Sequence, residues 1–145
     1  MPNWCENEVS IFGIEEGSEE EIKHFLKTCF VEGKIDFEKI IPYPEAAPSR
    51  DDEPEDIMEQ LNHPFAKWYN DFGYDWCVET WGTKWGAAHQ ENDLSTYYPE
   101  EISLKFSTAW GPPQGIYDKV QEILPNCSIS WFYKEEGMRV SGWLD

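Results

Sequence analysis

Apolar and polar positions alternate with a period of two near the start of the chain. Val9 and Ile11 are separated by polar neighbours, and the segment closes at Gly13. Successive side chains of a strand point to opposite faces of a sheet, so this alternation predicts a β-strand with one buried face. The chain is therefore expected to enter a sheet before Gly13.

A helix is predicted next, over residues 18–33. Apolar residues recur there at helical spacing: Ile22, Phe25, Leu26, Cys29 and Phe30. Ser18 followed three positions later by Glu21 has the pattern of a capping box, in which the two side chains satisfy free N–H groups of the first turn. Gly33 is expected to end the helix.

A second strand is predicted over residues 35–41, where Ile35, Phe37 and Ile41 are apolar. Pro42 and Pro44 lack the N–H that a strand ladder needs, so they are expected to end it. Residues 42–56 hold four prolines and a dense acidic run. This composition predicts an acidic, proline-rich loop.

The middle of the chain predicts helices, inserted over about residues 55–80. Two short helices are indicated, one by Ile57, Met58 and Leu61, and one opened by Pro64 that carries Phe65, Trp68, Tyr69 and Phe72. Residues 74–89 fit either a helix end followed by a strand or one long twisted strand. The first alternative is favoured.

The last third of the chain predicts strand, helix and strand in turn. Ile102, Leu104 and Phe106 alternate with polar residues, as in a half-buried strand. The helix that follows is opened by Pro112 and Pro113 and has an apolar face of Ile116, Tyr117, Val120, Ile123 and Leu124. A further strand is predicted at Ile129, Trp131 and Tyr133, and a turn near Gly137 returns the chain through Met138 and Val140.

Strand, helix and strand thus occur twice, over about residues 5–41 and 101–134. This doubling predicts an α+β fold of the split β-α-β type, an antiparallel sheet with helices on one face. With 145 residues, of which 40% are apolar and 16% aromatic, the chain is expected to form one domain over residues 1–145.

Charge is the second strong feature of the sequence. The chain has 29 acidic and 11 basic residues, a formal net charge of −18, and residues 1–75 hold 19 of the acidic residues and six of the basic ones. Such a field repels phosphate backbones and anionic membranes and attracts basic protein surfaces. We expect a partner with a basic surface and expect neither nucleic-acid nor membrane binding. A simpler alternative is that the charge only keeps the protein soluble.

The predicted acidic surface is made of two groups of carboxylates. One group surrounds the start of the first helix and the other lies in the proline-rich loop: Glu15, Glu16, Glu19 and Glu20, and Asp51, Asp52, Glu53, Glu55 and Asp56. The loop lacks the alternating ligands and the central glycine of a calcium loop. It is most simply a solvated loop.

Three tryptophan-bearing segments suggest a second candidate site: residues 2–5, 81–85 and 108–113. Lys84 lies between Trp81 and Trp85, and Thr108 and Trp110 would close the same end of the sheet if residues 81–85 and 108–113 are adjacent, which would make an aromatic-walled groove with one cation. The alternative is that these indoles fill the core between the sheet and the inserted helices.

No catalytic residue, metal ligand or cofactor site is predicted. The chain has no glycine-rich phosphate loop and no recognisable nucleophile or metalloprotease motif. His89, Glu91 and Asp93 alternate, but their polar neighbours favour an exposed turn over a metal site. The four cysteines are widely spaced and are expected to be reduced. Together with the absence of a signal peptide and of a long apolar run, this predicts a cytoplasmic protein.

Four segments carry a family resemblance: MPNWCENEVSIFG, FEKIIPYPE, WGTKWGA and FSTAWGPP. In this order and spacing the chain resembles the YubB-like proteins of phages and plasmids. The resemblance implies a ferredoxin-like domain and carriage on a mobile genetic element, and it implies no reaction.

These observations favour a non-enzymatic protein of a mobile element that docks an acidic surface on a basic host protein, such as a defence nuclease. Two alternatives stay open. Phe132 or Trp143 would stack bases if the sheet bound single-stranded RNA, and the tryptophan segments would hold a small ligand. The oligomeric state is not predicted.

Overall fold

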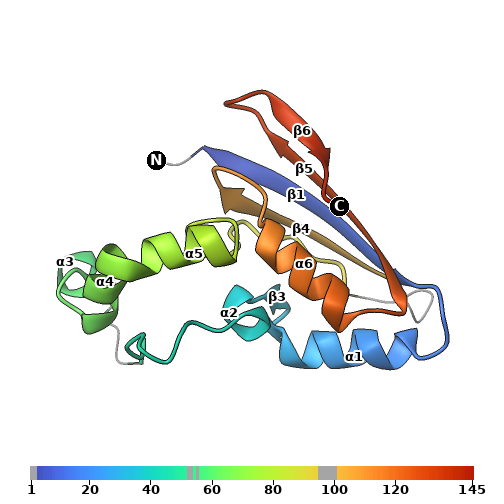
Figure 1. The fold of residues 1–145 in the computed structure, drawn as a ribbon, viewed down its shortest axis with the longest axis horizontal. Helices are drawn as coiled ribbons and strands as arrows, with labels where there is room; N and C mark the ends of the chain where they lie inside the picture. Colours follow the sequence, from blue (N-terminus) through green and yellow to red (C-terminus); the bar gives the residue numbers. More distant parts are fainter. Residues whose placement is uncertain (1–2, 52–53, 55, 95–100) are drawn as a thin grey trace.

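The computed structural model describes residues 3–51, 54, 56–94 and 101–145 (Figure 1). Its elements, in chain order, are β1 (Trp4–Gly13), α1 (Ser18–Thr28), β2 (Phe30–Val31), β3 (Lys34–Ile35), α2 (Phe37–Ile40), α3 (Ile57–Gln60), α4 (Pro64–Trp68), the π-helical turn η1 (Tyr69–Gly73), α5 (Tyr74–Thr80), β4 (Glu101–Ala109), α6 (Gln114–Ile123), β5 (Cys127–Glu135) and β6 (Val140–Trp143). Within these residues, none of the helices has the length and apolar character of a membrane span.

The main sheet has the strand order β4-β1-β5-β6, with every neighbouring pair antiparallel. Val9 of β1 lies opposite Leu104 of β4 on one side and Trp131 of β5 on the other. β4 and β5 are both antiparallel to β1, so they are parallel to each other, and α6 connects them. The segment 101–135 is therefore a split β-α-β unit with β1 between its two strands.

Residues 88–93 take the place of the second strand in the other β-α-β unit through two isolated bridges. The prediction of a strand at 35–41 is wrong for most of its length, because Ile35 lies in the short strand β3 and residues 37–40 are helical. Ala88 bridges Ser107 and Asp93 bridges Ser103, both antiparallel, so residues 88–93 follow the outer edge of β4 in the direction of β1. β4 thus lies between β1 and residues 88–93, the two extended segments of the unit that contains α1. In the same way, β1 lies between β4 and β5, the two strands of the unit that contains α6. The two interleaved units are the topology of a ferredoxin-like fold.

Residues 37–40 form a helix because Asp36 caps it. The Asp36 carboxylate accepts a hydrogen bond from the backbone N–H of Glu38 at 2.9 Å. Phe37 and Ile40 are then buried at a spacing of three residues, as one helical turn requires. The apolar pattern of this short segment fits a helix as well as a strand, and only its place beneath the sheet separates the two.

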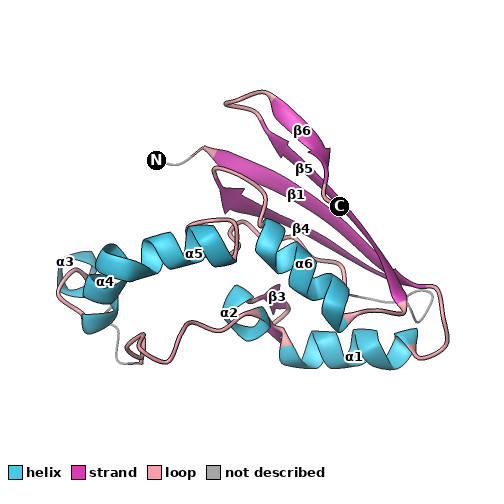
Figure 2. Ribbon diagram, viewed as in Figure 1, coloured by secondary structure: helices cyan, strands magenta, loops and turns pink. Residues whose placement is uncertain are grey.

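The core lies between one face of the sheet and the helices (Figure 2). The buried side chains that strands contribute to it are Val9, Ile11, Ile102, Leu104, Phe106 and Trp131, and those from α1 and α6 are Ile22, Phe25, Ile116, Tyr117 and Val120. These are the residues whose alternation or helical spacing predicted the strands at 9–11 and 102–106 and the helices after Ser18 and Pro113. Those predictions are confirmed, except that α1 ends at Thr28 and Phe30 lies in β2, so the helix does not extend to Gly33 as expected.

The start of α1 differs from the predicted capping box. The residue before the helix is Gly17, with φ of 94°, and the Ser18 hydroxyl is buried without a hydrogen-bond partner. Glu21 instead contacts the turn after α6, which lies beside the start of α1: its carboxylate accepts from the backbone N–H of Asn126 at 2.9 Å and from the Asn126 side-chain amide at 2.5 Å. Glu21 therefore joins α1 to the turn after α6.

Two glycines allow α6 to pack closely on the end of α5. A Cβ at Gly115 would lie 1.8 Å from the carbonyl oxygen of Thr80, and a Cβ at Gly82 would lie 2.7 Å from the backbone nitrogen of Gln114. Gly82 also has φ of 91°, where side chains are disfavoured. This contact brings residues 81–85 to the end of the sheet where β4 finishes.

Candidate functional site

The three tryptophan segments meet at one end of the sheet. Trp4 lies opposite Ala109 in the β1–β4 register, and its ring centroid is 6.3 Å from that of Trp85. The backbone N–H of Trp110 donates to the carbonyl of Asn3 at 2.8 Å. The adjacency of residues 81–85 and 108–113 is therefore present in the structure.

Lys84 is surrounded by three aromatic rings, a group we call the Lys84 cluster: Lys84, Tyr74, Trp85 and Trp110. Its ammonium lies 4.8 Å from the ring centroid of Trp85, 5.2 Å from that of Trp110 and 5.8 Å from that of Tyr74. These distances fall in the range of cation–π attraction. Tyr74 was missed by sequence reasoning, because it precedes Lys84 by a whole helix and carries no local motif.

Trp110 holds a strained backbone within this cluster. Its φ is 70°, a region that bulky residues rarely adopt, and 46% of its surface is exposed. Such outliers persist only where neighbouring contacts hold them. The hydrogen bond from its N–H to Asn3 and the one from the Thr108 hydroxyl to the Gly111 carbonyl, at 2.7 Å, hold this turn.

Trp81 and Thr108 lie in the interior rather than at the surface of a groove. Trp81 is 1% exposed, packs edge-on against Phe37 and donates its indole N–H to the carbonyl of Ile41 at 2.9 Å. Thr108 is fully buried and accepts a hydrogen bond from the side-chain amide of Asn7 at 2.9 Å. Of the five predicted groove residues, the structure thus brings Lys84, Trp85 and Trp110 together at the surface.

A separate cavity opens beside Trp85, with a volume of about 320 Å³. We call it the aromatic cavity, because its wall includes six aromatic residues: Phe37, Tyr43, Phe65, Tyr69, Trp81 and Trp85. The cavity is also lined by the polar residues Asp36, Glu38, Arg50, Gln60 and Asn70. Burial raises the pKa of the Tyr43 and Tyr69 hydroxyls well above their ordinary value, so both stay protonated. Tyr69 donates its hydroxyl hydrogen to the carbonyl of Lys84, which ties this cavity to the Lys84 cluster.

The thiols of Cys5 and Cys77 are buried. Burial raises the pKa of Cys5 to about 11 and that of Cys77 to about 12. A thiol with so high a pKa is protonated at neutral pH, whereas the thiolate is the reactive form. Neither cysteine therefore offers a nucleophile.

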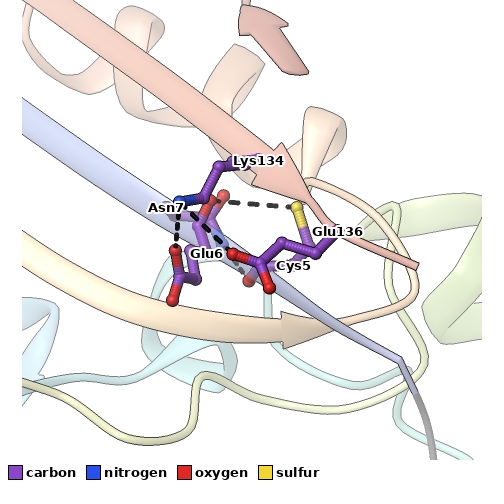
Figure 3. A network of polar contacts seen from close by, with 5 residues as sticks. All are labelled: Cys5, Glu6, Asn7, Lys134 and Glu136. Atoms are coloured by element: carbon purple, nitrogen blue, oxygen red, sulfur yellow. Dashed lines mark hydrogen bonds and ion pairs between the residues drawn. The ribbon is translucent and has the colours of Figure 1, made fainter. Parts of the chain in front are cut away.

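A surface network lies over the sheet near Cys5. The ammonium of Lys134 on β5 lies 3.3 Å from a carboxylate oxygen of Glu6 and 3.5 Å from one of Glu136, between the two side chains (Figure 3). These carboxylates raise the pKa of Lys134. The pairing neutralises one of the few cations on this face of the sheet.

Metal ligands do not come together in the part of the chain that the structure describes. No group of three or more His, Cys, Asp or Glu side chains there is placed to hold an ion. His89 packs edge-on against the ring of Trp4, with centroids 4.8 Å apart, and has φ of 51°. The side chain is thus engaged in the aromatic contacts at this end of the sheet.

The two predicted groups of carboxylates lie at opposite ends of the molecule's long axis. Figure 1 shows the start of α1, which carries Glu19 and Glu20, at one end, and the segment between α2 and α3, which contains Asp51, toward the other. Glu15, Glu16, Glu20, Asp51 and Asp56 are exposed, whereas Glu19 pairs with Lys23 at 3.0 Å. Asp52, Glu53 and Glu55 lie outside the described residues. The described carboxylates of the two groups therefore lie on different parts of the surface.

The two interleaved β-α-β units are the feature of this structure that identifies its fold. Residues 80–144 match the family model described as a ferredoxin-like domain in Api92-like protein. The matched range of this ferredoxin-like domain runs from the end of α5 through residues 88–93 to β6, and β1 lies before it. The expected α+β, ferredoxin-like fold is confirmed.

No curated protein and no solved structure matches the chain significantly. The finer resemblance to YubB-like proteins of phages and plasmids stays an interpretation of the sequence.

Proposed function

We propose that this chain is a non-enzymatic binding protein of a phage or plasmid, and that it acts in the cytoplasm of the host by docking on a basic protein such as a defence nuclease. The charge balance carries this proposal. If each of the 11 basic residues neutralised one carboxylate, the formal charge of −18 would still remain. That excess favours association with a cationic surface and raises the rate of encounter.

Exposed carboxylates lie at two separate places on the fold. Glu15, Glu16 and Glu20 are exposed near the start of α1, and Asp51 and Asp56 are exposed in the segment before α3. A basic partner of ordinary size contacts one of these ends rather than both, because they lie at opposite ends of the long axis. The end with Asp51 also bears the carboxylates Asp36 and Glu38 at the aromatic cavity.

The proposal is tested by capture from a bacterial host lysate at about 0.05 M and about 0.5 M salt, conditions between which surface electrostatics are strongly screened. Basic proteins are expected to bind at low salt and to be released at high salt. Capture that does not depend on salt, or that selects no basic proteins, contradicts the proposal.

Two variants, which remove three and two negative charges, locate the docking end. Glu15→Gln, Glu16→Gln and Glu20→Gln together remove charge at the start of α1, and Asp51→Asn with Asp56→Asn removes charge at the other end. Only one of the two variants is expected to weaken the capture beyond what its loss of net charge explains.

A second candidate function is binding of single-stranded RNA on the open face of the sheet. Phe132 and Trp143 lie opposite each other on β5 and β6 with ring centroids 5.0 Å apart, and Trp143 is 65% exposed. Such rings stack on bases in RNA-binding sheets. Glu6 and Glu8, however, occupy the neighbouring β1 positions on this face, opposite Lys134 and Phe132, and repel phosphates. A titration of wild type and Trp143→Ala with single-stranded RNA at low salt separates the two functions, because quenching that depends on Trp143 favours RNA.

A further inference from the structure

The aromatic cavity combines a wall of aromatic rings with carboxylates. Phe37 and Trp81 are each 1% exposed and form the buried part of its wall, and Tyr43 and Phe65 stand beside them with ring centroids 5.4 Å apart. A ligand that enters therefore meets the faces and edges of aromatic rings. Sites of this kind bind flat or apolar groups and orient them through a few polar contacts.

The polar contacts in this cavity favour a cation. Asp36 and Glu38 are the two acidic residues that line it, and Arg50 is the one basic residue among its described lining residues. The Asp36 carboxylate is held in place, because one oxygen accepts the N–H of Glu38 at the start of α2. A positive charge in the cavity is thus attracted both by these carboxylates and by the negative faces of the rings.

A guanidinium already lies against this wall. The central carbon of the Arg50 guanidinium is 4.7 Å from the centroid of the Phe65 ring. Arg50 belongs to the segment between α2 and α3, which also contains Asp51, so the cation is supplied by a connecting segment and not by the helices and strands that build the cavity. The protein itself shows which chemical group fits there.

We propose that the aromatic cavity binds an arginine side chain of the basic partner, which takes the position that Arg50 occupies in the free protein. This inference rests on the proposed function and deepens it. A guanidinium is planar, stacks on aromatic rings and donates paired hydrogen bonds to a carboxylate. A lysine ammonium is a compact charge that is not planar, so it cannot stack on a ring or donate such a pair. The volume of about 320 Å³ lies at the lower end for ligand sites and suits one side chain with its backbone.

The test uses three short peptides, acetyl-Gly-Xaa-Gly-amide, in which Xaa is arginine, lysine or citrulline. Citrulline has the shape of arginine without its charge. Binding is followed by the indole N–H resonances of Trp81 and Trp85, which line the cavity, with that of Trp143 on the sheet as an internal reference. The arginine peptide is expected to shift the first two and to bind at least about tenfold more tightly than the citrulline peptide. Equal binding of arginine and citrulline overturns the proposal.

Two variants distinguish an effect of the cavity carboxylate on binding from an effect of the net charge. Asp36→Asn keeps an acceptor for the cap of α2 and removes one carboxylate from the cavity, whereas Asp118→Asn on α6 removes the same charge and keeps an acceptor for Gln114. Asp36→Asn is expected to weaken binding of the arginine peptide about tenfold, and Asp118→Asn is expected to weaken it by less than about twofold. Equal effects of the two variants overturn the proposal.

Arg50→Gln removes the internal guanidinium. It is expected to tighten binding of the arginine peptide by about threefold or more, since the ligand no longer displaces Arg50. Unchanged or weaker binding shows that Arg50 is not a stand-in and overturns the proposal. If a variant fails to fold, the comparison of arginine with citrulline on the wild-type protein still decides.

The outcome is distinguishable from that of the proposed function. If basic host proteins bind wild type and Asp36→Asn alike and the arginine peptide does not bind, the cavity inference fails while the docking function stands. If the arginine peptide binds and no basic protein is captured at any salt concentration, the docking function fails and the cavity is a site for a smaller arginine-bearing ligand.

Discussion

The side-chain carbonyl of Asn7 on β1 accepts a hydrogen bond from the indole N–H of Trp131 on β5 at 2.9 Å. Both side chains are buried. The Asn7 amide donates in turn to the hydroxyl of Thr108, and that hydroxyl donates to the carbonyl of Gly111. A chain of hydrogen bonds therefore crosses the sheet from β5 to the turn that carries Trp110.

Asn7→Ala is expected to lower the free energy of unfolding by roughly 2–3 kcal/mol, because the buried N–H of Trp131 loses its acceptor. Chemical denaturation measures the loss. Asn62→Ala, at an exposed position after α3, is the control and should change stability by less than about 0.5 kcal/mol. Equal losses in both variants would show that the buried network contributes nothing specific.

Gly115→Ala is expected to destabilise the protein by roughly 1–3 kcal/mol or more, since the added methyl group would overlap the Thr80 carbonyl. Gly86→Ala is the matched control, because a Cβ there meets nothing within 4 Å. Thermal or chemical unfolding of the two variants provides the comparison. A stable Gly115→Ala protein would mean that α6 does not approach α5 as closely as described.

Glu21→Ala is expected to cost about 2 kcal/mol, because both hydrogen bonds to Asn126 involve a charged acceptor. Glu20→Ala changes the neighbouring, exposed carboxylate in the same turn of α1 and should cost less than about 1 kcal/mol. Urea unfolding distinguishes them. The reverse order would contradict the contact between Glu21 and Asn126.

Lys84→Met keeps the apolar stem of the side chain and removes the ammonium from the three rings. It is expected to lower stability by about 1 kcal/mol relative to Lys67→Met, which removes an exposed cation of α4 with the same effect on net charge. The emission of the exposed tryptophans Trp85 and Trp110 should also change in the first variant and not in the second. Identical behaviour of the two would contradict the Lys84 cluster.

Above pH 9 the buried thiol of Cys77 makes stability depend on pH. Its folded pKa of about 12 lies above the ordinary value of 9.0, so the folded state binds more protons in this interval and the free energy of unfolding falls as the pH rises. The contribution is complete below pH 9. The variant Cys77→Ala has no thiol at this position, so its free energy of unfolding lacks this dependence on pH.

The stability gap between wild type and Cys77→Ala should therefore narrow above pH 9, by up to about 1.4 kcal/mol per pH unit. Denaturant unfolding from pH 7 to pH 10.5 measures it. Titration of the other groups changes the free energy of unfolding of both proteins alike, so it cancels in the difference. A gap that stays constant with pH would show that the thiol titrates in the folded state as it does in the unfolded chain.

Much of the secondary structure could be predicted from the sequence, because its cause is local. The alternation at Ile102, Leu104 and Phe106 and the helical spacing from Ile22 to Phe25 each describe one buried face of one element. The favoured interpretation of residues 74–89 is confirmed for its helix, which ends at Thr80, whereas only an isolated bridge at Ala88 stands where the strand was expected. The segment 35–41 was misassigned because a few apolar residues fit both periodicities.

The candidate site was predicted only in part. Lys84 between two tryptophans is visible in the sequence, whereas its contact with Trp110 depends on residues 81–85 and 108–113 being adjacent, which the packing of the chain decides. The aromatic cavity was not found, because its walls come from α2, α4, η1 and the segments around them. No local pattern relates Arg50 to Phe65 or Phe37 to Trp81.

The sequence by itself determined the net charge, the periodicities that place α1, β4 and α6, and the abundance of tryptophan, because these depend on composition or on neighbours a few residues apart. The tertiary structure decided which segment lies at the edge of β4, where Glu21 finds its partner and how far apart the two acidic groups are. Each of these depends on contacts between residues distant in the chain. The free energy of such contacts exists only once the sheet and helices have packed together.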